Sequence, residues 1–119
     1  MSRILVVDDE VEICLLLTRY LTKQGCNASF SLSIAEALVK ISIDPYDLLF
    51  IDLNLKDGSG YDLINFLQKS DSHSKVIVIS AYDGERQKAL QVGANIFLAK
   101  PFTMKAIDES LISLSFLSK

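Results

Sequence analysis

The chain has 119 residues, of which 50% are hydrophobic and 23% charged, and this balance predicts one folded globular domain rather than a disordered chain. A formal charge of -3 argues against direct nucleic-acid binding, which needs a basic surface. With two cysteines, no signal peptide and no apolar stretch of bilayer length, the sequence predicts a soluble, cytoplasmic domain without membrane contact.

Strand-like and helix-like segments alternate along the whole chain. Three apolar runs lack polar alternation, which is typical of strands buried on both faces of a parallel sheet. The order predicts an α/β fold, a five-stranded parallel doubly wound sheet that fills residues 1–119 as one domain. In chain order we expect strand 4–7, helix 11–24, strand 27–32, helix 33–42, strand 48–51, helix 59–69, strand 76–79, helix 84–92, strand 95–99 and a helix from 103 to about 117.

Polar residues stand where four of the five predicted strands end. Asp8 and Asp9 follow the first strand, Asp52 follows the third, Ser80 the fourth and Lys100 the fifth. In a doubly wound sheet, ligands bind beyond the carboxyl ends of the strands. We therefore expect these five side chains to line one cleft.

Three carboxylates at one sheet edge repel each other, and a divalent cation resolves the conflict. Oxygen ligands without a His or Cys cluster favour Mg²⁺ or Mn²⁺ over zinc. The Ser80 hydroxyl and the Lys100 ammonium add groups that hold a phosphoryl group. Asp52 is the candidate nucleophile, because a carboxylate can form an aspartyl-phosphate.

Each of these residues also has an ordinary structural explanation. Acidic side chains such as Asp8 and Asp9 suit the start of a helix, Asp52 suits a turn cap, and a lone lysine is most often a solvated charge. Their coincidence at four strand ends favours the shared site.

Six short segments follow one another in a characteristic order. They are Val6-Val7-Asp8-Asp9-Glu10, Asp52-Leu53-Asn54-Leu55, Asp57-Gly58-Ser59-Gly60, Ser80-Ala81, Gly93-Ala94 and Phe97-Leu98-Ala99-Lys100-Pro101-Phe102. Together they make the chain resemble the receiver domain of two-component response regulators over essentially its whole length. The resemblance implies the (βα)5 flavodoxin-like receiver fold.

The resemblance also implies a phosphorylation site. Asp52 would accept a phosphoryl group from a phosphohistidine on a sensor histidine kinase or a histidine phosphotransfer protein. Asp9 and Asp52 would bind Mg²⁺ directly, together with the backbone carbonyl of Asn54, and Asp8 would reach the ion through water. Such a module takes up and later loses a phosphoryl group, and we class it as a signalling domain rather than an enzyme.

Further roles follow from the same resemblance. Ser80 would donate a hydrogen bond to one phosphoryl oxygen, and Lys100 would pair with another. Ser80 and Phe97 would form a switch, in which the hydroxyl moves toward the phosphate and the ring swings inward. The Lys100–Pro101 bond is expected to be cis.

The loop after Asp52 departs from the family in one position, because Lys56 stands where proline is common. We expect a more mobile loop and an altered phosphate lifetime. Asn54 and Tyr82 are the variable neighbours of the site, and we hypothesise that the Tyr82 ring shields the acyl phosphate from water.

The first predicted helix has two apolar sides. One side is expected to face the core and contains Cys14, Leu17 and Leu21. The other contains Ile13, Leu16 and Tyr20 and lies near charged residues. It is either a wider buried stripe or a docking surface for the helical bundle that carries the phosphohistidine.

Three alternatives to a stand-alone receiver remain on the sequence. The chain is a receiver piece of a longer response regulator, a degenerate receiver that is not phosphorylated, or a small Mg²⁺-dependent aspartyl-phosphate phosphatase similar to haloacid dehalogenases. The complete set of site residues argues against the degenerate receiver. That phosphatase family separates its two acids by one residue, whereas Asp8 and Asp9 are adjacent, and no cap segment is present.

Overall fold

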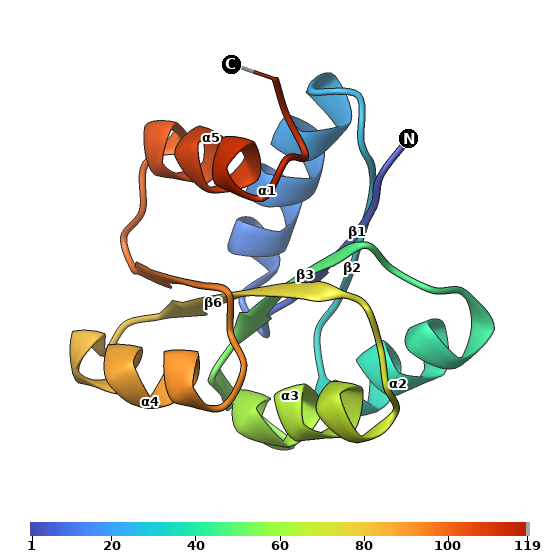
Figure 1. The fold of residues 1–119 in the computed structure, drawn as a ribbon, viewed down its shortest axis with the longest axis vertical. Coiled ribbons are helices and arrows are strands. Elements are labelled where there is room, and N and C mark those ends of the chain that lie inside the picture. The colour runs from blue at the N-terminus through green and yellow to red at the C-terminus, as the bar shows by residue number, and fades with distance from the viewer. Residues whose placement is uncertain (119) are drawn as a thin grey trace.

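One parallel sheet of five strands forms the centre of the computed structural model, which describes residues 1–118 (Figure 1). Its strands are β1 (Arg3–Val7), β2 (Asn27–Ser31), β3 (Leu48–Asp52), β6 (Lys75–Ser80) and β7 (Ile96–Ala99). They are hydrogen-bonded in the order β2-β1-β3-β6-β7. The predicted doubly wound sheet is confirmed, and its strand order reverses at β1 and β3, where such folds form their ligand crevice.

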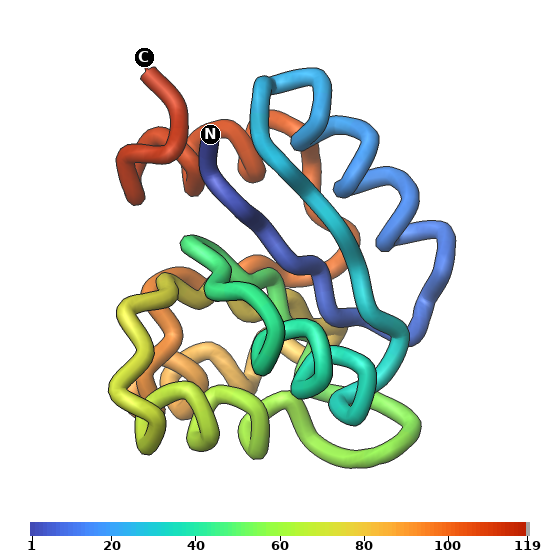
Figure 2. The backbone as a smooth tube through the Cα atoms, turned by 90° about the vertical axis from the view of Figure 1, so that its right-hand side faces the viewer, coloured from blue at the N-terminus to red at the C-terminus, as the bar shows by residue number. Residues whose placement is uncertain are grey.

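Helices cover both faces of this sheet (Figures 1 and 2). They are α1 (Val11–Lys23), α2 (Ile34–Ile43), α3 (Gly60–Lys69), α4 (Arg86–Gln91) and α5 (Met104–Ser113). Helices α1 and α5 lie on one face, and α2, α3 and α4 lie on the other. No helix within residues 1–118 has the length and apolarity needed to cross a bilayer.

Side-chain alternation along the strands explains why both faces are apolar. In β1, Ile4 and Val6 pack toward α1 and α5, while Leu5 and Val7 pack toward α2 and α3. All four are fully buried. An amphipathic strand would leave one face exposed, so the unbroken apolar runs require helices on both sides.

Hydroxyl side chains begin three of the helices. The Ser33 Oγ accepts a hydrogen bond from the Glu36 amide at 3.1 Å, and the Thr103 Oγ1 accepts one from the Ala106 amide at 3.1 Å. Ser59 caps α3 in the same way. These caps satisfy backbone donors that have no partner inside the helix.

Two predicted helices differ from the structure. The segment expected as one helix from 84 to 92 starts with a 3₁₀ turn, η1 (Asp83–Glu85), before α4. The last helix ends at Ser113 rather than near residue 117, because Ser115 adopts a left-handed conformation (φ 68°). The Phe116 amide then donates to the Leu111 carbonyl at 2.7 Å and closes the helix end.

A short hairpin that the sequence did not predict follows the third main strand. It pairs β4 (Asn54–Leu55) with β5 (Gly58–Ser59) in antiparallel register. Two-residue strands carry too little periodicity to be recognised in a sequence.

Candidate phosphorylation site

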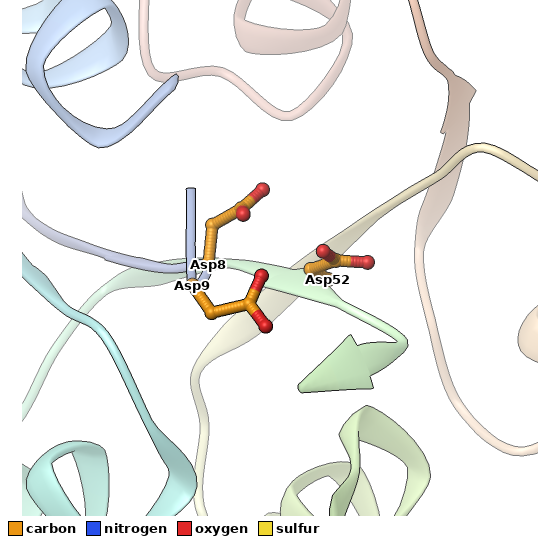
Figure 3. Close-up of side chains that lie close together, drawn as sticks. All are labelled: Asp8, Asp9 and Asp52. Carbon is orange, nitrogen blue, oxygen red and sulfur yellow. The ribbon is translucent and has the colours of Figure 1, made fainter. Parts of the chain in front are cut away.

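The ends of β1 and β3 bring three aspartates together at the sheet edge (Figure 3). Asp8 is fully buried, Asp52 is buried and Asp9 is half-buried. One carboxylate oxygen from each lies within 4.8 Å of the others. The structure therefore brings together the three acids that the sequence placed at one edge.

Lys100, which follows β7, supplies a positive charge to this cluster. Its Nζ lies 3.0 Å from Asp8 Oδ2, 3.2 Å from Asp52 Oδ2 and 3.3 Å from Glu10 Oε1. The Lys100 amide donates to the Ser80 carbonyl at 2.8 Å, which fixes the lysine backbone beside the end of β6. The Lys100–Pro101 peptide bond is cis, as expected.

Burial and neighbouring charges shift the pKa values of these groups. Desolvation raises the pKa of Asp8, and the nearby negative charge of Asp52 raises it further, against the hydrogen bond from the Glu10 amide and the Lys100 ammonium 3.0 Å away. Burial alone would lower the pKa of Lys100, but the ion pair with Asp8 and the charge of Asp52 outweigh it, so this pKa is raised. The lysine is therefore protonated throughout the physiological range.

The arrangement suits a hard divalent cation. Asp8 Oδ2 receives no well-directed hydrogen bond from residues 1–118, although Lys100 Nζ is close to it. Two oxygens on one Mg²⁺ lie up to about 4.2 Å apart. The three carboxylate oxygens here lie within 4.8 Å of one another, so they need little rearrangement to share an ion. Four acids, Asp8, Asp9, Glu10 and Asp52, exceed the single charge of Lys100, and a cation would offset that excess.

The backbone on the other side holds Asp52 in place. Its Oδ1 accepts a hydrogen bond from the Asn54 amide at 3.1 Å. Gly60, at the start of α3, packs so closely that an added Cβ would overlap the Asp52 backbone oxygen and lie 2.9 Å from Leu53 Cα. The start of α3 can approach the Asp52 backbone only because residue 60 has no side chain.

The two expected switch residues lie on adjacent strands, with Ser80 at the end of β6 and Phe97 paired with Val78 inside the sheet. Ser80 is fully buried, and its Oγ accepts a hydrogen bond from the Tyr82 amide at 3.1 Å. The side chain of Phe97 is 3% exposed and belongs to the core under α3 and α4. The ring is thus inward here, while the serine hydroxyl is bonded to its own loop.

The residues expected to tune phosphate lifetime form an exposed rim. Asn54, Lys56 and Tyr82 are all exposed, and the Tyr82 side chain reaches 63%. Their positions border the site, and their effect on phosphate lifetime stays a prediction.

The second apolar side of α1 is only partly exposed. Ile13 and Tyr20 are half-buried against the core, and the Tyr20 hydroxyl donates to Asp108 on α5. Leu16 is 51% exposed. A pocket of about 470 Å³ borders Lys100 and is lined in part by Ile13, Leu16 and Phe102.

Two acidic residues, one at the site and one in the turn between β4 and β5, make contacts that were not expected from the sequence. Glu10 was assigned no role, although it pairs with Lys100 across 90 positions, and its place after Asp9 was the available signal. Asp57 accepts hydrogen bonds from the Ile34 and Ala35 amides, both at 3.0 Å, and so fastens the hairpin to the start of α2. These two bonds lower the pKa of Asp57, and nothing in its local sequence indicated them.

Comparison with known proteins gives a consistent result. Residues 4–112 match the family described as response regulator receiver domain. The response regulator protein PilR of Pseudomonas aeruginosa is 33% identical over 110 residues, which cover 91% of this chain and 25% of PilR. The sensor protein EvgS of Escherichia coli is 33% identical over 113 residues, which cover 93% of this chain and 9% of EvgS. This chain therefore spans a quarter or less of either relative.

A solved structure supports the same likeness. The response regulator TrrA from Thermotoga maritima, in complex with Mg²⁺-BeF, matches with a TM-score of 0.87 at 31% identity. The match covers 96% of this chain and 99% of TrrA. The fold, the residues at the strand ends and the relatives all point to the same family of receiver domains.

Proposed function

The chain belongs to the response regulator receiver domain family, and from this membership we propose that Asp52 accepts a phosphoryl group from a partner phosphohistidine. The observation that carries the proposal is the setting of the Asp52 carboxylate. Its Oδ2 lies 3.2 Å from the Lys100 ammonium, and two further aspartates stand beside it. Signal transduction in the cytoplasm is the process that this chemistry serves.

The proposed transfer is a single displacement at phosphorus. A carboxylate oxygen of Asp52 donates an electron pair to phosphorus, and the bond to the donor imidazole nitrogen breaks. The imidazole leaves with the electron pair of the broken phosphorus–nitrogen bond and later takes a proton from solvent. In this proposal Lys100 and the Ser80 hydroxyl would hold the phosphoryl oxygens, whose charge must be stabilised in such a transfer, and the 3.2 Å contact of Lys100 Nζ with Asp52 Oδ2 supports the role of the lysine.

Asp8, Asp9 and Asp52 would hold Mg²⁺, with the Asn54 carbonyl as a proposed further ligand. When bound, the ion supplies positive charge to the phosphoryl oxygens and offsets repulsion among the carboxylates. Mn²⁺ has the same ligand preference. Two observations support this assignment: oxygens of the three acids lie within 4.8 Å of one another, and the buried Oδ2 of Asp8 accepts no hydrogen bond from the described residues.

We propose a sensor histidine kinase or a histidine phosphotransfer protein as the partner that donates the phosphoryl group. Ile13, Leu16 and Tyr20 on α1 are the proposed contacts, since Ile13 and Leu16 line the pocket beside Lys100. PilR and EvgS are much longer than this chain, so we propose receiver activity for it and none of the other activities of those proteins.

The test is intact mass spectrometry after incubation with acetyl phosphate, with Mg²⁺ or with EDTA. The proposal expects one phosphoryl group on the wild type with Mg²⁺, none with EDTA and none on Asp52→Ala. Asp62→Ala, an exposed aspartate on α3, is the matched control and should be modified normally. Modification of Asp52→Ala would identify another acceptor. An unmodified wild type, both with acetyl phosphate and with a phosphorylated histidine donor, would refute the proposal.

A further inference from the structure

Arg86, the first residue of α4, contacts the switch residue Phe97 in two ways. Its guanidinium carbon lies 4.8 Å from the centre of the Phe97 ring. Its Nη1 donates a hydrogen bond to the Phe97 carbonyl at 3.3 Å. The Arg86 side chain therefore covers the Phe97 ring and is hydrogen-bonded to the backbone of the same residue.

A third contact ties Arg86 to the loop that follows Ser80. Its Nη2 lies 2.9 Å from Asp83 Oδ1, and Asp83 starts the η1 turn three residues after Ser80. The Arg86 side chain is 49% exposed, so it forms the outer cover over the ring. Arg86 thus connects Phe97 to the loop that follows Ser80.

The position of the ring indicates what this cover does. Phe97 is 3% exposed, and the Ser80 hydroxyl accepts a hydrogen bond from the Tyr82 amide. The Arg86 guanidinium lies over the buried ring and is hydrogen-bonded to the Phe97 carbonyl, so it is in place to favour the inward position.

We propose that Arg86 is a positioning residue that holds the Phe97 ring inward. This inference rests on the proposed function in one respect, namely that the ring position is coupled to phosphorylation of Asp52. A cation above an aromatic face is attracted by the ring quadrupole, and the bond to Asp83 keeps the guanidinium oriented. For a half-exposed contact we expect about a three- to fivefold effect on the ratio of inward to outward rings.

A second consequence follows from linkage. If a bound phosphoryl group and Arg86 both favour the inward ring, loss of Arg86 must weaken binding of a phosphoryl mimic. The loss in affinity cannot exceed the factor by which Arg86 shifts the ring. Arg86 touches none of the acids at the site, so direct charge effects on them are small compared with those of Lys100.

The experiment labels the protein with 4-fluorophenylalanine and follows the Phe97 fluorine by NMR. The chain has six phenylalanines, and Phe97→Leu assigns the resonance by its loss. Saturation transfer measures the outward population, and the fluorine shift between H₂O and D₂O identifies the exposed state. Arg86→Gln removes the guanidinium. Lys88→Gln is the matched control, because it also removes one positive charge from α4, but the Lys88 ammonium lies over the Tyr61 ring and not over Phe97.

Without any ligand, Arg86→Gln should raise the outward population about three- to fivefold, and Lys88→Gln should leave it unchanged. Equal outward populations in wild type and Arg86→Gln, including none detectable in both, would overturn the inference. Titration with beryllofluoride and Mg²⁺ forms the second arm, in which Arg86→Gln should bind up to about fivefold more weakly. A wild type that neither binds the mimic nor becomes phosphorylated would refute the proposed function, while the ligand-free measurement would still decide the role of Arg86.

Discussion

Replacement of Lys100 by methionine tests whether charge balance stabilises the site. Methionine keeps an unbranched apolar stem but removes the ammonium that contacts Asp8, Glu10 and Asp52 at 3.0 to 3.3 Å. The side chain of Lys100 is 13% exposed, so water replaces the lost charge poorly. Asp8 and Asp52 would then face each other without a cation.

The structure sets the size of the effect. At an effective dielectric of 20, each of the two closest contacts amounts to about 5 kcal/mol before desolvation is counted. Desolvation offsets most of this, and removal of one partner from a buried pair typically costs about 3–5 kcal/mol. Asp8 can relieve part of the repulsion by taking up a proton. We therefore expect Lys100→Met to lower the free energy of unfolding by about 2–3 kcal/mol at pH 8 without Mg²⁺.

The loss should depend on pH in a defined direction. The folded-state pKa of Asp8 lies above its ordinary value of 3.8 because of burial, and it rises further in Lys100→Met. Between the ordinary and the raised pKa, the folded state binds more protons than the unfolded state, so stability falls as pH rises through this window. The deficit of the variant should be smaller at pH 5 than at pH 8. Mg²⁺ should also reduce it, since the ion binds the folded acids preferentially.

Urea unfolding at pH 5 and pH 8, with Mg²⁺ or with EDTA, measures these effects. Lys105→Met, an exposed lysine on α5, is the matched control and should change stability little. A deficit below about 1 kcal/mol, or one insensitive to both pH and Mg²⁺, would show that charge balance at Lys100 does not stabilise the site.

Three further predictions concern other parts of the site. Gly60→Ala should lower stability by at least about 2 kcal/mol in urea unfolding, since its Cβ overlaps the Asp52 backbone, whereas Gly84→Ala has open space and should cost little. Tyr82→Ala should lose its phosphoryl group faster by intact mass, and unchanged or slower loss would contradict the shielding hypothesis. Ile13→Ala/Leu16→Ala should slow phosphotransfer from a phosphohistidine partner but not from acetyl phosphate, and equal rates with both donors would exclude docking at this surface.

Much of the fold was predictable because strands that are buried on both faces of the sheet have a recognisable local sequence pattern. The run from Ile4 to Val7 has no polar alternation, and this pattern holds whichever strands become its neighbours. Helix starts at Ser33 and Thr103 were also predictable, since a cap acts within three residues. The end of the last helix was not predictable: the left-handed turn at Ser115 has no glycine to mark it, and the helix stops four residues early.

The site likewise has features that were predictable from the sequence and features that were not. The order of residues was enough to place Asp8, Asp52 and Lys100 at strand ends and to predict that they share one edge of the sheet. The individual contacts depend on the assembled sheet, because strand order places β1 beside β3 and brings the Lys100 ammonium within 3.0 Å of Asp8 and 3.2 Å of Asp52. The Glu10 contact with Lys100 and the Arg86 cover over Phe97 join elements whose packing no local pattern encodes. Such contacts depend on long side chains that reach across neighbouring elements, and their partners exist only once the sheet has assembled.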